Sequence, residues 1–306
     1  MLFRSGLTAG AARRNASNPR TVGGAMNVAG AVGGGAPAGD SADQENRYTA
    51  GLDARLRIGP FGLDPTVSYQ WGHYDTQALR TNGTVGKVRG EASAWLFDVI
   101  GSFQLGPLLL EGRGAYSTGN KARDNLSQSK RYYEPLDLDT GYWSGGWLGI
   151  LGLGVDYFNG GGPTNQGMDT NIGYDRYGRI QVALRATYSI TPALSVYGVV
   201  APTWAAEKVD TDTGCPALNV ATSATGCPAR VIVSDRSFVE GDSRYIGTEI
   251  NGGFTWRFAA NTAFDLAGYY LAAGPALKLS EIQNGVAVKK DQHDGYYAAA
   301  RVRLSF

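Results

Sequence analysis

The last eleven residues of the chain, YYAAARVRLSF, follow a period of two. Tyr296 and every second residue up to Phe306 are apolar, whereas Arg301, Arg303 and Ser305 fall on the alternate positions. Successive side chains of a β-strand point to opposite sides, so these two sets occupy opposite faces. The pattern therefore predicts a strand with one face in an apolar environment and the other in a polar environment.

The same alternation recurs along residues 47–306. The segments that carry it are 47–58, 63–74, 87–103, 108–117, 143–157, 176–190, 194–206, 244–258, 262–272 and 296–306. Tight turns rich in Pro, Gly and Asn join some of these segments, and long polar loops join the others. We place the long loops near 75–86, 118–142, 207–243 and 273–294.

Strand direction predicts that these segments are not the whole sheet. The tight turns make 143–157 and 176–190 run in the same direction, although neighbours in an antiparallel sheet alternate. We therefore expect one further strand near them, and eleven or twelve strands in all. Within 87–103 the alternation slips near 95–98, which predicts a β-bulge.

These features predict an all-β fold, an antiparallel transmembrane β-barrel. The segments are long enough for a tilted crossing of a bilayer, which takes about 9–11 residues, and aromatic residues gather near their ends. Short turns at one end and long loops at the other are typical of that architecture. A half-buried soluble sandwich also alternates, but a second sheet would cover its apolar face. Hydrocarbon cannot satisfy unpaired backbone groups, so we expect the sheet to close.

The first 46 residues differ from the rest, because they are rich in Gly and Ala and keep no period. We expect residues 1–46 to be a loop or a truncated remnant. An exported protein needs a signal peptide and none is visible at Met1, so we expect an N-terminally truncated portion of a larger barrel. A sequence trimmed by hand is the alternative.

Composition agrees with strands and turns. The 306 residues include 44 Gly and 17 Tyr, and no run of about 18 apolar residues could span a bilayer as a helix. The formal net charge of +1 indicates no nucleic-acid partner. No Rossmann, P-loop, zinc or calcium motif is present, so we expect neither a cofactor nor a metal.

Cys215 and Cys227 are the only cysteines, and each is followed by Pro in the polar loop 207–243. The chain has no CxxC pattern, which argues against a metal or redox site. We predict a disulfide between Cys215 and Cys227 that restrains this loop.

The polar face of the predicted strands is rich in arginine. The candidate pore-lining residues are Arg55, Arg57, Arg113, Arg179, Arg185, Arg257, Arg301, Arg303, Asp53, Glu111 and Glu249. Arginine stays charged when partly desolvated and presents a planar fork to carboxylates and phosphates. Its surplus predicts a modestly positive wall that concentrates anions in a confined channel.

A structural role is the alternative for each arginine, because Arg and Asp or Glu can pair across the inside of a barrel. Asp53 beside Arg55 and Arg57, and Glu111 beside Arg113, are such pairs. Four others have no acid on their own inward face, and we expect them to line an anion path. These four are Arg179, Arg185, Arg301 and Arg303.

Three segments are similar to the alginate-export family of outer-membrane proteins. They are SYQWGHYDT (68–76), AYSTGNKARDN (115–125) and YYEPLDLDTGYWSGG (132–146), about a third of the chain with their surroundings. The family has Ser-Gly-Asp where this chain has Ser117-Thr118-Gly119-Asn120, and residues 158–306 add little to the match. The resemblance implies a large β-barrel with an arginine-lined path for an anionic polysaccharide, without assigning any single arginine.

The closing strand also resembles that of bacterial outer-membrane barrels, which implies that the barrel-insertion machinery binds Phe306. Together the patterns predict a porin of the Gram-negative outer membrane, surrounded by lipid, that passes small polar or anionic solutes, an anionic polysaccharide among them.

Two alternatives stay open. One is a barrel enzyme, a protease or a lipase. His73 lies near Asp75 and His293 lies among acids, but neither forms a converging catalytic group, so we predict no catalytic residue. The other is a structural or adhesive barrel, although eleven or more strands would leave room for water inside.

Overall fold

The computed structural model describes residues 2–15, 44–79, 85–122, 124, 129–133, 147–151, 177–211, 232–233, 236–237 and 241–304. Within these ranges the only helix is the short 3-10 turn η1, Pro275–Leu277. No helix among them is long and apolar enough to cross a membrane.

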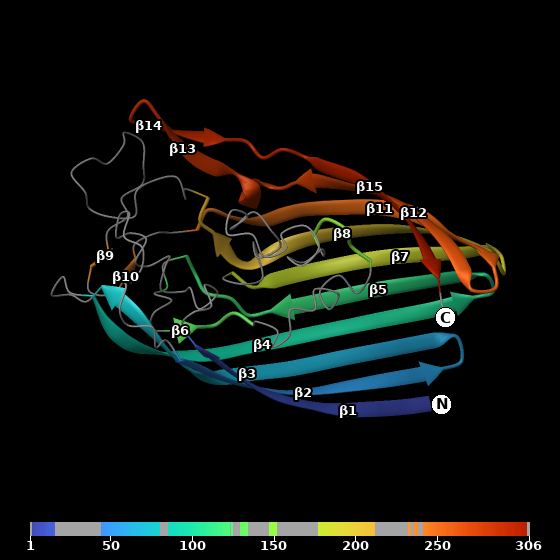
Figure 1. The fold of residues 1–306 in the computed structure, drawn as a ribbon, viewed down its shortest axis with the longest axis horizontal. Coiled ribbons are helices and arrows are strands. Elements are labelled where there is room, and N and C mark those ends of the chain that lie inside the picture. Colours follow the sequence, from blue (N-terminus) through green and yellow to red (C-terminus); the bar gives the residue numbers. More distant parts are fainter. Residues whose placement is uncertain are drawn as a thin grey trace.

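A single antiparallel sheet runs through the molecule in the order β1-β2-β3-β4-β5-β7-β8-β11-β12-β15 (Figure 1). Its strands are β1 (Leu2–Asn15), β2 (Gln44–Ile58), β3 (Phe61–Leu79), β4 (Val85–Leu105), β5 (Leu108–Ser117), β7 (Arg179–Thr191), β8 (Leu194–Val209), β11 (Ser243–Ala259), β12 (Thr262–Ala273) and β15 (Gly295–Leu304). Strands that follow one another on this path pair with each other, as in a meander. The structure confirms the predicted all-β, antiparallel fold.

Short strands accompany this sheet on the side of the long connections. β6 (Ser129–Lys130) pairs in parallel with β4. The other short strands form two hairpins, β9 (Ile232–Val233) with β10 (Arg236–Ser237), and β13 (Leu279–Gln283) with β14 (Val286–Lys290).

In the described chain, the four tight turns that join neighbouring strands of this main sheet lie at one end of it, and both labelled chain ends lie near that end (Figure 1). Gly59 and Gly106 hold φ angles of 58° and 56° in two of these turns, a conformation that side chains disfavour and glycine adopts freely. We refer to this end as the turn end of the sheet.

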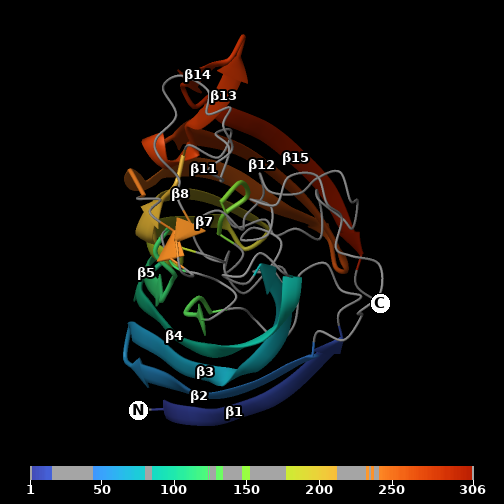
Figure 2. The ribbon, with the colours of Figure 1, turned by 90° about the vertical axis from the view of Figure 1, so that its left-hand side faces the viewer.

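The sheet is strongly curved and wraps around the interior of the molecule (Figure 2). On its convex side, the outer face, large apolar side chains are exposed. They include Tyr48, Leu52, Trp71, Trp95, Phe97, Val99, Leu110, Tyr116, Val182, Leu184, Tyr188, Ile250, Trp256, Tyr270 and Val302. On its concave side, the inner face, polar and charged side chains are buried alongside small apolar ones such as Ala94, Ala115 and Ala201. The polar and charged ones include Arg47, Thr49, Ser68, Gln70, Arg113, Ser117, Arg179, Gln181, Thr203, Glu249 and Asn251.

This polarity is the reverse of that in a water-soluble sandwich, where the apolar face is covered. Leu184 is 59% exposed and Ile250 is 51% exposed, so no second layer covers them within the described chain. The alternation read from the sequence thus gives the correct direction for these outward apolar and inward polar side chains.

Aromatic rings form bands on the outer face. One band runs across β2, β3, β4 and β5 from Tyr48 through Trp71 and Trp95 to Tyr116, with neighbouring centroids 4.5–6.2 Å apart. At the turn end, the rings of Phe61 and Phe103 lie 4.7 Å apart, and Trp256 and Phe258 lie 5.4 Å apart. Such rings at both ends of the strands agree with the predicted girdles.

Two strand predictions are wrong. The number of strands is not one of them, because the sheet in the described chain has ten strands on its path and β6 beside it. Residues 147–151 form turns instead of the middle of a strand 143–157, and β5 pairs directly with β7 through Ser117 and Arg179. Without that strand the directions of the described strands alternate, so a further strand is no longer required to explain them. The pairing of β3 with β4 is continuous, so 95–98 is not a bulge.

The apparent slip in β4 has a local cause. Leu96 is an apolar residue on the inner face, where it packs with Ala94 and Tyr133. The outer face keeps Trp95 and Phe97, so the alternation of side-chain direction is intact even though the alternation of polarity is not.

Two segment boundaries differ from the predictions. Part of the segment 1–46, expected as a loop or remnant, forms β1. The expected loop 75–86 is mostly strand, because β3 and β4 continue to pair as far as Leu79 and Val85. That pairing turns the expected loop into the end of a long hairpin.

The predicted closure into a barrel is not observed. β1 and β15 are the two edges of the sheet and do not pair with each other (Figure 2). β1 runs away from the turn end, since Leu2 pairs with Arg57, and β15 runs toward it, since Leu304 pairs with Thr262. The two edges therefore have the antiparallel directions that closure of a meander requires.

Candidate functional site: the inner face of the sheet

Part of the interior is occupied by the chain itself. Residues 147–151, which we call the inner turn, pack with their apolar side chains against the inner face of β7, β8, β11 and β12. The buried cluster includes Trp147, Leu148, Leu151, Tyr177, Ala183, Val199, Ala201, Ala205, Ile246 and Leu271. A segment between β5 and β7 thus folds back into the concave side of the sheet.

A buried carboxylate holds this inner turn. Glu249, with 0% of its surface exposed, accepts hydrogen bonds from the backbone N–H groups of Gly149 (2.6 Å), Ile150 (2.9 Å) and Leu151 (2.7 Å). Three successive N–H groups that converge on one anion form a strong binding site for negative charge. The carboxylate of β11 therefore fixes the backbone of a segment about one hundred positions away in sequence.

Asn251 completes the attachment from the same strand. Its Nδ2 donates to Glu249 Oε1 and to the carbonyl oxygen of Trp147, both at 2.8 Å. Glu249 and Asn251 lie two residues apart on β11, so both side chains point to the inner face. Glu249 accepts hydrogen bonds from the inner turn and Asn251 donates one to it, so both side chains hold the turn against the inner face.

Tyrosine rings set the space available to the inner turn. A Cβ atom at Gly149 would lie 2.2 Å from Tyr269 Cδ1 and 2.3 Å from Tyr297 Oη, so no larger residue fits without movement. The rings of Tyr269 and Tyr297 stack with centroids 4.4 Å apart. On the other side, the Arg185 guanidinium lies 6.0 Å from the Trp147 ring centroid and 5.0 Å from that of Tyr197.

Toward the turn end, the inner face carries ion pairs between neighbouring strands. Arg113 bonds Asp98 at 2.6 Å, and Arg185 lies 3.8 Å from Glu111. Arg57 donates from Nη2 to Asp64 at 2.8 Å. These pairs form a charge ladder along the inner face.

Asp265 is the acid of the ladder with the most partners. It accepts from Arg301 Nε at 2.9 Å and from Arg303 Nε at 2.6 Å, and Thr255 Oγ1 donates to it at 2.6 Å. The carboxylate of β12 thereby joins β11 to β15.

Three of the four arginines that we expected to line an anion path have an acid on a neighbouring strand. Arg301 and Arg303 share Asp265, and Arg185 faces Glu111. Arg179 is 1% exposed and also has interaction partners. The acids lie on neighbouring strands, where they could not be found by searching along each strand alone.

The expected pairs within one strand are also replaced. Arg113 bonds Asp98 instead of Glu111, and Arg57 bonds Asp64 instead of Asp53. Arg113 lies opposite Ile100 and Arg57 lies opposite Gly62, so each arginine reaches an acid at a diagonal position on the neighbouring strand. Diagonal positions lie about 7–8 Å apart, within reach of long side chains.

Two of the predicted pore-lining arginines differ from the rest. Arg55 and Arg257 occupy exposed positions in line with the inner face of β2 and β11. Among the described residues no ion pair or hydrogen bond of either side chain is found, and the same holds for Asp53. Among the predicted pore-lining arginines, these two therefore have no acid partner in the described part of the chain.

The remaining sequence predictions fare differently. Cys215, Cys227 and Phe306 lie outside the described residues. His73 contacts Asn46 through Nε2 at 3.0 Å. Near His293, Asp291 pairs with Lys278 at 2.7 Å, and Asp294 accepts from the Ala273 N–H at 2.9 Å. In the described ranges no three potential metal ligands gather.

The list of candidate residues omitted three participants, Asp98, Asn251 and the inner turn. A continuous alternation through β4 would have placed Asp98 on the inner face. Asn251 shares the inner-face parity of Glu249. The surplus strand direction that 143–157 created was the signal against a strand there.

Comparison with known proteins adds little. No family model matches the chain, and no curated protein matches it. Among solved structures, the NanC porin aligns over 100% of both chains with a TM-score of 0.35 and 9% sequence identity. A likeness this distant supports no conclusion about function, so the function is inferred from the side chains themselves.

Proposed function

We propose that this chain forms a channel in the outer membrane of a Gram-negative bacterium and passes small polar or anionic solutes along its inner face. The observation that carries this proposal is the reversed polarity of the sheet. Large apolar side chains such as Leu184 and Ile250 are exposed on the outer face, whereas Arg113, Gln181 and Glu249 are buried inside. In water such an outer face would be unfavourable, but in hydrocarbon it is the expected one.

Membrane insertion also requires that the backbone be paired. Within the sheet each strand bonds its neighbours, and the edges β1 and β15 run in opposite directions. In a bilayer their unpaired groups would cost several kcal/mol each, which favours closure of these edges against each other or against further strands.

The interior supports a narrowed, polar path. The charge ladder lines it toward the turn end, and the inner turn narrows it on the side of β7, β8 and β11. Arg55 and Arg257 supply cations that no acid among the described residues neutralises. We therefore propose a modest preference for anions, set by these two arginines rather than by Arg301 and Arg303.

The solute is proposed only by class. A path lined by guanidinium groups suits carboxylates and phosphates, because the planar fork matches both. The sequence similarity to the alginate-export family would make an anionic polysaccharide one such solute, and this stays a prediction.

Planar-bilayer recording tests the proposal. Purified, folded protein is reconstituted, and single-channel conductance and the reversal potential in a KCl gradient are measured. We expect discrete, ohmic channels with a reversal potential on the anion-selective side. Folded protein that inserts without conducting would overturn the channel, and cation selectivity would overturn the assignment of Arg55 and Arg257.

A further inference from the structure

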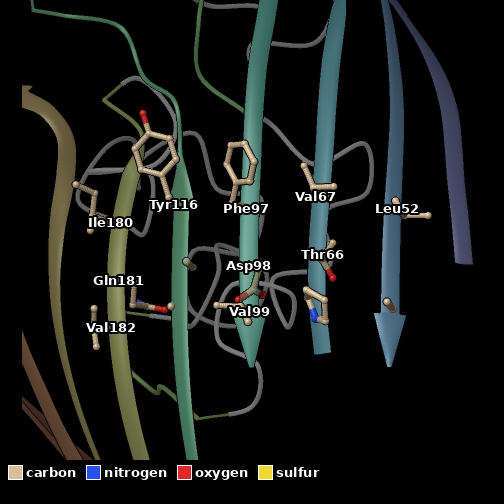
Figure 3. A pocket seen from close by; sticks show the side chains of 14 residues that line it. Leu52, Thr66, Val67, Phe97, Asp98, Val99, Tyr116, Ile180, Gln181 and Val182 are labelled. Atoms are coloured by element: carbon tan, nitrogen blue, oxygen red, sulfur yellow. The ribbon is translucent and has the colours of Figure 1, made fainter. Parts of the chain in front are cut away.

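The outer face carries a hollow that the channel function does not use. It has a volume of about 580 Å³ and crosses β2, β3, β4, β5 and β7 (Figure 3). Its lining combines outward side chains with backbone between them. The labelled apolar residues are Leu52, Val67, Phe97, Val99, Tyr116, Ile180 and Val182. We call it the outer groove.

The register of the sheet explains its shape. One row of large side chains runs across the strands, each residue paired with the next. This row is Leu52, Val67, Phe97, Tyr116 and Ile180. The parallel row one step toward the turn end is made of smaller groups. It contains Pro65, Val99, Gly114 and Val182 in successive pairs, with Ala54 at its edge.

Gly114 forms the floor of the outer groove. It has no side chain and lies between Val99 and Val182, its partners on the two adjacent strands. One step further, Gly101 pairs with Gly112, so the surface stays low beyond it. A trough along the row of small residues results, with the large row as its wall.

The size of the outer groove selects its occupant. Its volume falls within the ~300–1,000 Å³ typical of sites for small molecules. A stable contact with a second copy would bury roughly 800 Å² on each partner, an area that extends far beyond a trough of this size. Four strand spacings of about 4.8 Å give a length of roughly 19 Å, which suits one extended hydrocarbon chain.

We propose that the outer groove is a binding site for one acyl chain of a membrane lipid. Thr66, Asp98 and Gln181 also line it, but they alternate with the outward residues and belong to the inner face. Of the outward side chains that line it, only Tyr116 carries a hydrogen-bonding group, and the others are apolar. An acyl chain that lies in the outer groove contacts apolar atoms on its floor and along its wall. A chain elsewhere on the convex outer face contacts the protein from one side only. The inference rests on the membrane location proposed above and adds a preferred place for lipid.

Photolabelling tests it. The protein is reconstituted in vesicles of phosphatidylethanolamine and phosphatidylglycerol that contain a phosphatidylethanolamine with a diazirine in its acyl chain. After irradiation, labelled peptides are located by mass spectrometry. We expect labels to concentrate in β3, β4 and β5 around Phe97 and Tyr116.

Two glycine variants provide a matched pair. Gly114→Leu fills the trough, and its Cβ has ordinary contact with Val99 Cγ1 at 3.7 Å. Gly268→Leu places the same side chain on the outer face of β12, where no atom lies within 4 Å of the added Cβ. We expect G114L to lower labelling of the groove peptides about tenfold, equivalent to 1.4 kcal/mol, and G268L to leave it unchanged.

Ala54→Leu is a second filling variant in case G114L fails to fold. Labels spread evenly around the sheet in wild-type protein, or labelling unaffected by both filling variants, would overturn the acyl-chain site. Cross-links between two copies at Phe97 or Tyr116 would overturn it too, in favour of an oligomer contact. Failure to enter vesicles at all would instead count against the proposed membrane channel, so the two failures are distinguishable.

Discussion

Two carboxylates on neighbouring strands of the inner face have opposite surroundings. Asp265 on β12 accepts from two arginines, Arg301 and Arg303, on exposed side chains. Glu249 on β11 is fully buried and accepts from backbone N–H groups and from Asn251, with no cation beside it among the described residues. One acid neutralises charge on the wall, and the other holds an inserted piece of chain.

The difference teaches which contacts set the shape of the interior. An exposed ion pair is screened by water and ions and contributes little to stability, about 0–1 kcal/mol. A buried carboxylate whose donors would otherwise be unpaired contributes more, because each donor left without an acceptor costs roughly 1–3 kcal/mol. We therefore expect the inner turn to depend on Glu249, whereas substitutions at Asp265 or its two arginines should alter ion selectivity only by leaving one partner of these pairs unbalanced.

The largest effect is expected for Glu249→Ala. The three N–H groups of the inner turn would lose their acceptor, at roughly 1–3 kcal/mol each, and the turn would leave the inner face. We expect single-channel conductance to rise and amide exchange at 149–151 to become fast. Glu207→Ala is the matched control, because Glu207 forms a half-exposed pair with Arg244 at 3.5 Å. Equal conductance in wild type and E249A would show that the turn does not narrow the path.

Gly149→Ala disturbs the same attachment from the side of the inner turn. The added methyl group would overlap Tyr269 and Tyr297, and overpacking of this kind costs roughly 1–3 kcal/mol. We expect a smaller rise in conductance than in E249A. Gly268→Ala, where the added Cβ meets nothing within 4 Å, should leave conductance unchanged. If G149A conducts like G268A, the tyrosine wall is not what confines the turn.

The sequence predicts the two faces of the sheet better than it predicts the pairings between strands. The direction of a side chain follows from the period of two, a local property, so the outer Tyr296 and the inner Arg303 could be assigned. Strand length and the tight turns are local as well. The antiparallel order of the sheet followed from them.

Pairings between strands are not local and were mostly wrong. Arg301 and Arg303 meet an acid 36 and 38 positions away, which only the register of β12 and β15 brings near them. The inner turn alternates like a strand in sequence, but Glu249 and the tyrosines determine its conformation from the far end of the chain. A tertiary contact overrode the local pattern there.

Ion selectivity provides the next test of the difference between Asp265 and Glu249. Asp265→Asn would leave Arg301 and Arg303 without their carboxylate, so we expect the reversal potential to shift toward greater anion selectivity. Replacing both arginines with Gln would expose Asp265 and should shift it the opposite way. Conductance should change little in either variant. Shifts of the same sign would show that these three residues do not face the ion path.

A smaller shift is expected from Arg55→Gln combined with Arg257→Gln. No acid among the described residues neutralises these cations, so their loss should lower anion preference without freeing a carboxylate. Arg244→Gln serves as the control for loss of a paired arginine, because Arg244 pairs with Glu207 at the start of β11. An unchanged reversal potential in R55Q/R257Q would assign the anion preference to other groups.

The smallest effect concerns Asp242, outside the membrane-spanning part of the sheet. Burial alone would raise the pKa of Asp242, but hydrogen bonds from Lys289 and Thr211 outweigh it and hold the pKa below its usual 3.8. Because the pKa of Asp242 is lowered in the folded state, its bond to Lys289 of β14 stabilises the protein at pH values above the ordinary pKa. This contribution is lost as the pH falls through the lowered pKa. Both side chains are more than a third exposed, so we expect on the order of 0.5 kcal/mol.

Lys289→Met should therefore speed amide exchange in the hairpin β13–β14 slightly at neutral pH, and should make no difference well below pH 3.8, where wild-type Asp242 is itself protonated. Lys290→Met is the neighbouring control on the same strand. We expect any effect of this substitution on amide exchange in the hairpin to be independent of the protonation of Asp242. A K289M effect that persists unchanged in acid would assign the hairpin's attachment to packing. The weak surface pair would then have no part in it, whereas Glu249 would still hold the inner turn by buried hydrogen bonds.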